Sequence, residues 1–167
     1  MVTLPKKIHL TALGKHWKIS HIHSPGKLAM IEQPERKLVI YGMHYSKRAA
    51  IRLLLKWIKL KSQDYLSMQT LKFNCKTNVK YKKLRVRPLK TGWGNCSSDK
   101  TISLNYLSIF LPPTLLRHLI IHELCHIRYL DHSPQFWEEV AKFDRNWKKN
   151  KIALHEADVY IPKWVLF

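Results

Sequence analysis

The hydrophobic and polar residues of the chain follow one period in its first quarter and another period after it. Three segments between residues 8 and 42 alternate or run apolar, and turn formers such as Ser24-Pro25-Gly26 separate them. Alternation with a period of two is typical of strands. We therefore expect a small antiparallel β-meander over residues 1–45, with strands in the segments 8–23, 28–31 and 37–42.

From residue 46 onward the apolar residues recur at helical intervals, with Lys and Arg between them. This pattern predicts one long amphipathic helix over about residues 47–72. Two short alternating segments, 83–89 and 101–104, then predict a pair of strands, and the turn-rich segment 91–100 joins them.

The most apolar helical pattern follows Pro112-Pro113 and predicts a helix over about residues 114–130. Because its apolar residues lie nearly all round the helix, we expect it to be central and buried. Ser133-Pro134 pairs an N-cap residue with a proline at the first helical position, which predicts another helix to about residue 147. The expected fold is α+β, with a small antiparallel or mixed sheet packed on the buried helix.

Length and composition indicate a globular protein of one domain. The chain has 167 residues, and 46% of them are hydrophobic. This fraction excludes a disordered basic tail, and the length fits a single domain. We expect the domain to comprise the N-terminal meander, about residues 1–45, and a core of about residues 46–167.

Positive charge is both large and unevenly distributed. The 30 Lys and Arg against 11 Asp and Glu give a formal net charge of +19. Residues 36–98 hold 16 of the cationic residues and a single acidic one, Asp64. Such a surface suits polyanions, so contact with nucleic acid or a nucleotide is open. Lysines that only solvate the outer faces of helices and strands are the alternative.

The three cysteines, Cys75, Cys96 and Cys125, show no C-x-x-C spacing. An odd, scattered set argues against a disulfide framework and fits a reducing compartment. No apolar run approaches the roughly 18 residues that would suggest a membrane span, and the first residues do not resemble a signal peptide. We expect a cytoplasmic protein without membrane contact.

The helix that we expect to be buried carries the sequence His122-Glu123-Leu124-Cys125-His126. Residues four apart on a helix share a face, so the two imidazoles can bind one Zn²⁺ ion. Glu123 projects about 100° around the helix from His122, where it can take a proton from water at an open position of the metal. Because burying these polar residues without a ligand would be costly, we favour a metal site over an incidental set of polar residues.

A third metal ligand is expected from the residues that follow the helix. His132 lies six residues after His126, a distance that lets the helix end and the chain turn back. His155 and Glu156, from the C-terminal part, are the alternatives for this position. Three protein ligands with one open position are typical of catalytic zinc, although Mn²⁺, Co²⁺ or Ni²⁺ can bind the same donors. We expect one ion per chain.

Several runs together resemble the YgjP-like family of bacterial metal-dependent hydrolases, which is related to the SprT-like and WLM zinc metallopeptidases. The resemblance rests on Trp93-Gly94-Asn95-Cys96-Ser97-Ser98, on HELCH, and on Asp131-His132-Ser133-Pro134-Gln135-Phe136-Trp137. Gly92 stands where that family usually has an arginine.

This resemblance implies a zincin-like fold, with zinc held by His122, His126 and His132 and with Glu123 as general base. By analogy with zincins, the strand around Thr101–Asn105 is expected beside the cleft, where an extended peptide could pair with it.

Three functions stay open at this point. The first is zinc-dependent hydrolysis of peptide bonds, which the HExxH arrangement and the resemblance favour. The second is hydrolysis of a nucleoside triphosphate to release pyrophosphate, as with UTP, which a basic approach to the site would suit. The third is a nucleic-acid-binding module that zinc stabilises, and Glu123 argues against it because a structural site needs no base. The sequence gives no prediction of the oligomeric state.

Overall fold

The N-terminal sheet consists of four strands in the order β1-β2-β4-β3. The computed structural model describes residues 3–43 and 45–166. The strands are β1 (Lys7–Leu10), β2 (Lys15–Ile22), β3 (Ala29–Gln33) and β4 (Lys37–Tyr41). The β1–β2 and β3–β4 pairs are antiparallel, whereas β2 and β4 run parallel.

The predicted antiparallel meander is therefore wrong in its topology. The turn after Ser24 does not join two paired strands, because β4 lies between β2 and β3. The reason is visible in β4, where Leu38, Val39 and Ile40 are all buried. A run of three buried residues needs cover on both faces of the sheet and suits an interior strand. The first predicted strand, residues 8–23, is also interrupted by a 3-10 turn at Thr11–Leu13.

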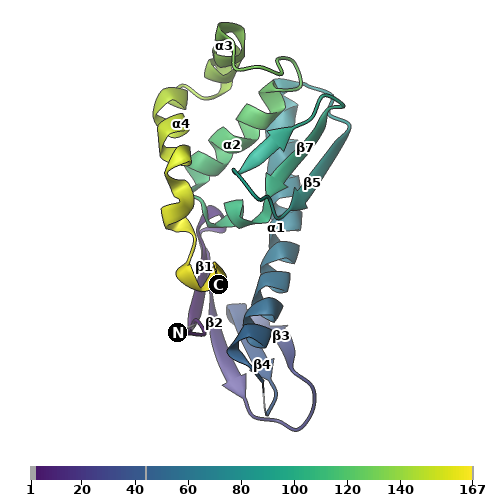
Figure 1. Cartoon of the computed structure of the whole chain (residues 1–167), viewed down its shortest axis with the longest axis vertical. Helices are drawn as coiled ribbons and strands as arrows, with labels where there is room; N and C mark the ends of the chain where they lie inside the picture. Colours follow the sequence, from purple (N-terminus) through teal and green to yellow (C-terminus); the bar gives the residue numbers. More distant parts are fainter. Residues whose placement is uncertain (1–2, 44, 167) are drawn as a thin grey trace.

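Helix α1 (Lys47–Thr77) is longer than predicted and links the two ends of the molecule (Figure 1). Ser46 caps it, and the Ser46 side chain accepts a hydrogen bond from the backbone N–H of Ala49. Its first half packs Leu54 and Ile58 against the N-terminal sheet. Its second half packs Leu66 and Phe73 into a second hydrophobic cluster, which includes most of the buried residues of the later helices.

The second sheet has three strands in the order β5-β7-β6. They are β5 (Lys83–Arg87), β6 (Gly94–Cys96) and β7 (Thr101–Asn105). The predicted pairing of the first and last of these strands is confirmed, and it is parallel. Strand β6 lies inside the segment that the sequence indicated only as a turn. Because β7 is paired on both edges, it cannot pair with a peptide, and the edge strand that contacts α2 is β6.

Three further helices follow: α2 (Pro113–Cys125), α3 (Pro134–Phe143) and α4 (Trp147–His155). Helix α2 contacts α1, α3, α4 and β6 and is buried along most of its length, as predicted. It ends five residues earlier than predicted, at Cys125. The helix predicted over residues 134–147 ends earlier, at Phe143, and α4 is a separate helix that was not predicted. Between them lies Asp144, whose side chain accepts hydrogen bonds from the backbone N–H of Asn146 and from the Asn150 amide.

The α+β fold is confirmed, with two small mixed sheets at the two ends of α1 (Figure 1). Short 3-10 helices occur at Thr11–Leu13, Pro34–Arg36, Tyr106–Phe110, Ala157–Tyr160 and Lys163–Val165. Within residues 3–43 and 45–166, no helix is long and apolar enough to cross a membrane. The fold places α2 between the second sheet and α4, and this arrangement positions the site described next.

Candidate metal centre

Three imidazole rings meet where α2 ends. The Nε2 atom of His122 lies 3.0 Å from Nε2 of His126 and 3.1 Å from Nε2 of His132. The potential ligand atoms of the three residues all lie within 4.8 Å of one another, so the cluster could hold a metal ion. Nitrogens bound to one tetrahedral zinc ion would lie about 3.3 Å apart, so this donor set fits zinc.

The turn after α2 orients the second and third of these histidines. His126 follows the last helical residue, and its Nδ1 atom lies 2.8 Å from the backbone oxygen of Tyr129. A ring whose Nδ1–H donates to a carbonyl keeps Nε2 free to bind a metal. The ring of His132 stacks on Trp137, and Phe136 lies against the ring of His126.

Arg128 ties this turn to two other helices. Its guanidinium donates to the backbone oxygen of Thr77 at 2.9 Å, at the end of α1. It also forms an ion pair with Glu139 on α3, whose side chain is buried. The turn that carries His132 is therefore anchored to α1 on one side and to α3 on the other.

The electrostatic surroundings favour the neutral form of His122 and His126. Burial, together with the neighbouring His126 and His132, lowers the pKa of His122 to about 3. Burial also lowers the pKa of His126. Neutral imidazole is the form that binds metal ions, so these shifts favour metal binding at neutral pH.

Glu123 lies beside this cluster and is almost completely buried, with 4% of its surface exposed. Its Oε2 atom is buried and has no hydrogen-bond partner in the described part of the chain. Burial raises the pKa of this carboxyl group to about 8. Most buried polar atoms have a partner, and one that lacks it often marks a functional site. A carboxylate next to three imidazoles is also what a metal-dependent hydrolase requires, so the donor set and its neighbour fit a catalytic ion.

Strand β6 covers the Glu123 side chain at very short range. A Cβ atom added to Gly94 would lie 2.6 Å from Oε1 of Glu123 and 2.9 Å from its Cγ. Only glycine allows the strand to approach this closely. Gly94 thus allows β6 to lie on Glu123, and the neighbouring Trp93 ties the same strand to α4. The indole N–H of Trp93 donates to the backbone oxygen of Leu154 near the end of that helix.

A cavity of about 560 Å³ opens beside His122 and Glu123. Its wall is mixed, with aromatic and aliphatic side chains on one part and charged or polar ones on another. The remaining lining residues are Gly92, Trp93, Gly94, His118, Leu119, His132, Trp137, Lys151, Leu154, His155 and Asp158. Gly92 has a φ of +72°, a conformation that favours glycine.

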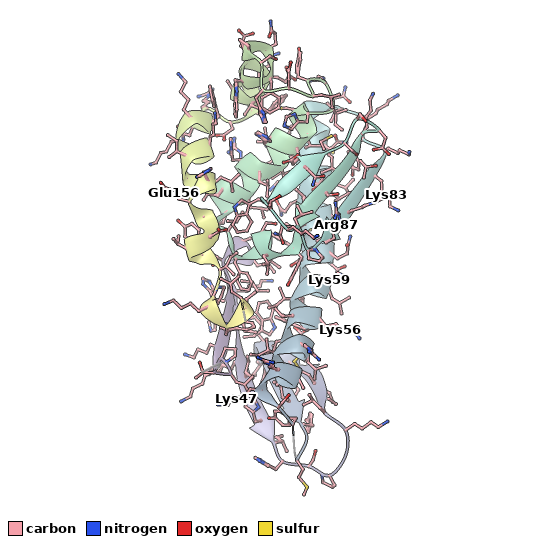
Figure 2. The ribbon with its side chains drawn as sticks, viewed as in Figure 1. Lys47, Lys56, Lys59, Lys83, Arg87 and Glu156 are labelled. Carbon is pink, nitrogen blue, oxygen red and sulfur yellow. The ribbon has the colours of Figure 1, made fainter. Side chains whose placement is uncertain are left out.

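The structure brings together three of the residues proposed from the sequence as ligands and separates two. His132 joins His122 and His126, whereas His155 lines the cavity without belonging to the cluster. Glu156 is exposed at the end of α4 (Figure 2). Cys125, which lies between Glu123 and His126 in the sequence, is buried in the hydrophobic cluster and is not part of the histidine cluster.

Sequence reasoning did not predict a histidine–aspartate pair, of which His118 lines the cavity. His118 is buried one turn before His122, and its Nδ1 atom lies 2.7 Å from Oδ2 of Asp144. The amide of Asn150 donates to both oxygens of Asp144. Burial lowers the pKa of His118, although Asp144 opposes this shift. The spacing of four residues between His118 and His122 could have indicated that both lie on one face of the helix. The pairing with Asp144 could not be predicted, because it depends on where α3 ends.

With this geometry established, comparison with known proteins identifies the family. The sequence model described as YgjP-like, metallopeptidase domain, matches residues 3–157. The chain belongs to this family. Among curated proteins the comparison finds no match.

Two solved structures of metallopeptidase zymogens are similar to this YgjP-like chain. One is Pyrococcus abyssi abylysin, with 23% identity, a TM-score of 0.49, and coverage of 55% of this chain and 93% of that one. The other is Methanocaldococcus jannaschii jannalysin, with 19% identity, a TM-score of 0.49, and coverage of 55% of this chain and 95% of that one.

The contact between β6 and Glu123 gives a first prediction. Gly94→Ala should lower the free energy of unfolding by about 1–3 kcal/mol, because the new methyl group overlaps a buried side chain. Urea denaturation measures this change. Asn95→Ala, on the exposed neighbour in the same strand, is the control and should change stability little. Equal stability of the Gly94→Ala variant and the unchanged protein would contradict the close contact.

Proposed function

We propose that this chain is a zinc-dependent peptide hydrolase of a single domain. In this proposal His122, His126 and His132 hold one ion, and Glu123 is the general base. The observation that supports it most is the convergence of three imidazole nitrogens beside a buried carboxylate oxygen that lacks a partner. Membership of the YgjP-like metallopeptidase family supports the peptide bond as the bond that is cut.

A bound zinc ion would supply Lewis-acid polarisation of the scissile carbonyl and would make water at its open position more acidic. Glu123 takes a proton from the attacking water at its carboxylate and passes it to the nitrogen of the departing amine. The water oxygen bonds to the carbonyl carbon first, and the carbon–nitrogen bond breaks once the nitrogen has received the proton. The contact of Gly94 with Glu123 holds the carboxylate in one position for both transfers.

Strand β6 supports binding of the substrate as an extended peptide. The backbone N–H of Asn105 donates to Trp93 and that of Ser97 donates to Thr101, so residues 93 and 97 face β7. Backbone groups alternate along a strand, so the N–H and C=O groups of Gly94 and Cys96 point to the free edge. A peptide that pairs with this edge would pass beside Glu123, and one of its side chains would enter the cavity.

Lys151 supports a second candidate, hydrolysis of a nucleoside triphosphate on the same site. This residue lines the cavity together with His122, and its ammonium group lies 4.5 Å from the centroid of the Trp137 ring. A cation at this place suits a phosphate group, and the adjacent indole suits a base. The same donor set and the same Glu123 would serve this reaction.

The metal assignment predicts the metal content of three variants. His122→Ala and His126→Ala should each lose the ion that the purified protein carries, because two imidazoles hold zinc much more weakly than three. Elemental analysis after gel filtration measures this. His155→Ala, a histidine of the cavity outside the cluster, is the matched control and should keep the ion. Retention of zinc in the first two variants would refute the ligand assignment.

The assignment of Glu123 predicts a loss of turnover without a loss of metal. Glu123→Gln should keep its zinc and lower the rate by about 10²–10⁴-fold, because the amide cannot accept the proton. The measurement is a paired assay with an unfolded protein substrate and with nucleoside triphosphates. Glu138→Gln, on the exposed face of α3, is the control and should keep full activity.

The paired assay also decides between the two candidate substrates. Cleavage of the protein substrate, abolished in Glu123→Gln, supports the peptidase. Release of pyrophosphate without peptide cleavage overturns it in favour of the nucleotide hydrolase. Full activity of Glu123→Gln on either substrate overturns the role of this residue.

A further inference from the structure

Seven exposed cationic residues form a row on the side of the molecule away from α4. We call this row the basic strip. It consists of Arg48, Arg52, Lys56 and Lys59 of α1 and Lys83, Arg85 and Arg87 of β5. Figure 2 shows Lys56, Lys59, Lys83 and Arg87 along one side of the molecule, from the second sheet towards the start of α1, with Glu156 on the opposite side.

The helical part of the strip lies on one face of α1. Its residues are spaced by four, four and three positions, the spacing of neighbours on a helix surface, and they extend over about 16 Å. The same face is buried further along the helix. Leu66, Thr70 and Thr77, each buried, come 18 residues, or five turns, after Arg48, Arg52 and Lys59. The second sheet therefore begins where the exposed basic face ends, and α1 contacts β5 directly.

The strand part of the strip continues this row on the outer face of the second sheet. Lys83, Arg85 and Arg87 alternate with Leu84 and Val86, which face the hydrophobic cluster. Their neighbours across the parallel pair are polar residues of β7. The three cations extend over about 13 Å, because strand residues advance about 3.3 Å each.

The cations of the basic strip are not neutralised by acidic residues of α1, β5 or the segments between them. Between residues 36 and 122 only Asp64 and Asp99 are acidic. Asp99 is engaged by Lys82, Ser97 and Thr101. Asp64 projects at least about 80° around α1 from the helical part of the strip. Within the described residues, no member of the strip takes part in an ion pair.

The geometry of the strip suits a polymer of phosphates better than a single nucleotide, because its cations are spread along two elements. None of its members is aromatic, and side chains that stack on bases are usual where proteins bind single strands. Of the exposed apolar residues of α1, Met68 and Leu71 lie on another face, and Leu60 alone lies at the edge of the strip, one turn after Lys56. One leucine is not the apolar face that inserts into a membrane surface.

We propose that the basic strip binds the phosphate backbone of double-stranded nucleic acid without reading its bases. Each contact between a cation and a phosphate releases a counterion, so the affinity falls as salt rises. The strip is separate from the metal centre, since it lies on α1 and β5 and the cavity lies between α2, α4 and the loop before β6. Binding is therefore independent of the proposed hydrolysis.

The test compares two variants of equal charge. One carries Lys56→Gln, Lys59→Gln and Arg85→Gln in the strip. The control carries Lys149→Gln, Lys163→Gln and Arg145→Gln in the C-terminal part of the chain. All six side chains are exposed, and none of them makes a hydrogen bond or ion pair within the described residues, so both variants should fold. Fluorescence anisotropy with a duplex of about 20 base pairs, from about 50 to 200 mM salt, gives the affinity and its salt dependence.

The strip variant should bind the duplex about tenfold more weakly or worse, and the slope of log K against log salt should fall by about 2 to 3. The control variant should stay within about threefold of the unchanged protein. An equal loss of duplex affinity in both variants would overturn the proposal, because binding would then depend on net charge and not on the strip. Tighter binding to single strands of the same length, or to anionic phosphatidylserine vesicles, would overturn duplex nucleic acid as the partner.

Discussion

The structure depends on the burial of a helix that carries two histidines and a glutamate and is followed directly by a third histidine. Helix α2 is covered by α1, α3, α4 and β6, yet it holds His118, His122 and Glu123 and leads into His126. Buried polar groups need partners, because leaving them without one costs free energy. His118 is hydrogen-bonded to Asp144, and His126 is hydrogen-bonded to the backbone carbonyl of Tyr129. The Nε2 atoms of His122, His126 and His132 face one another, and within the described residues Oε2 of Glu123 has no hydrogen-bond partner. A metal ion and water would supply the missing partners.

Local patterns predicted most of the elements but not their arrangement. The apolar periodicity was sufficient to predict α1 and the buried α2. The alternation of residues 83–87 and 101–105 was sufficient to predict β5 and β7. The order of the first sheet depends on contacts between distant segments, which no local period contains. Strand β6 has only three residues, one of them a glycine, which is too short for a recognisable alternation. The break at Asp144 depends on hydrogen bonds to Asn146 and Asn150, and helical spacing gives no sign of it.

The site could be predicted as far as its residues follow helical spacing. His122, Glu123 and His126 lie in one short run, and the turn after them favoured His132 over His155. Two other features could not be derived in the same way. The need for glycine at position 94 arises because β6 lies on Glu123, a contact between segments 29 residues apart. The anchoring of the ligand turn by Arg128 needs α1 and α3 in place.

The uneven charge now has a structural explanation that composition could not give. Helix α1 packs against the first sheet with one face and against the second sheet with another. The face that is buried near its end must therefore be exposed near its start, and lysines and arginines are the residues that occupy it. Because β7 and β6 separate β5 from the cavity, a polyanion on the strip leaves the opening beside Glu123 free. The basic strip and the cavity beside Glu123 thus lie on different surfaces, so a polyanion bound to the strip would not block access to the cavity.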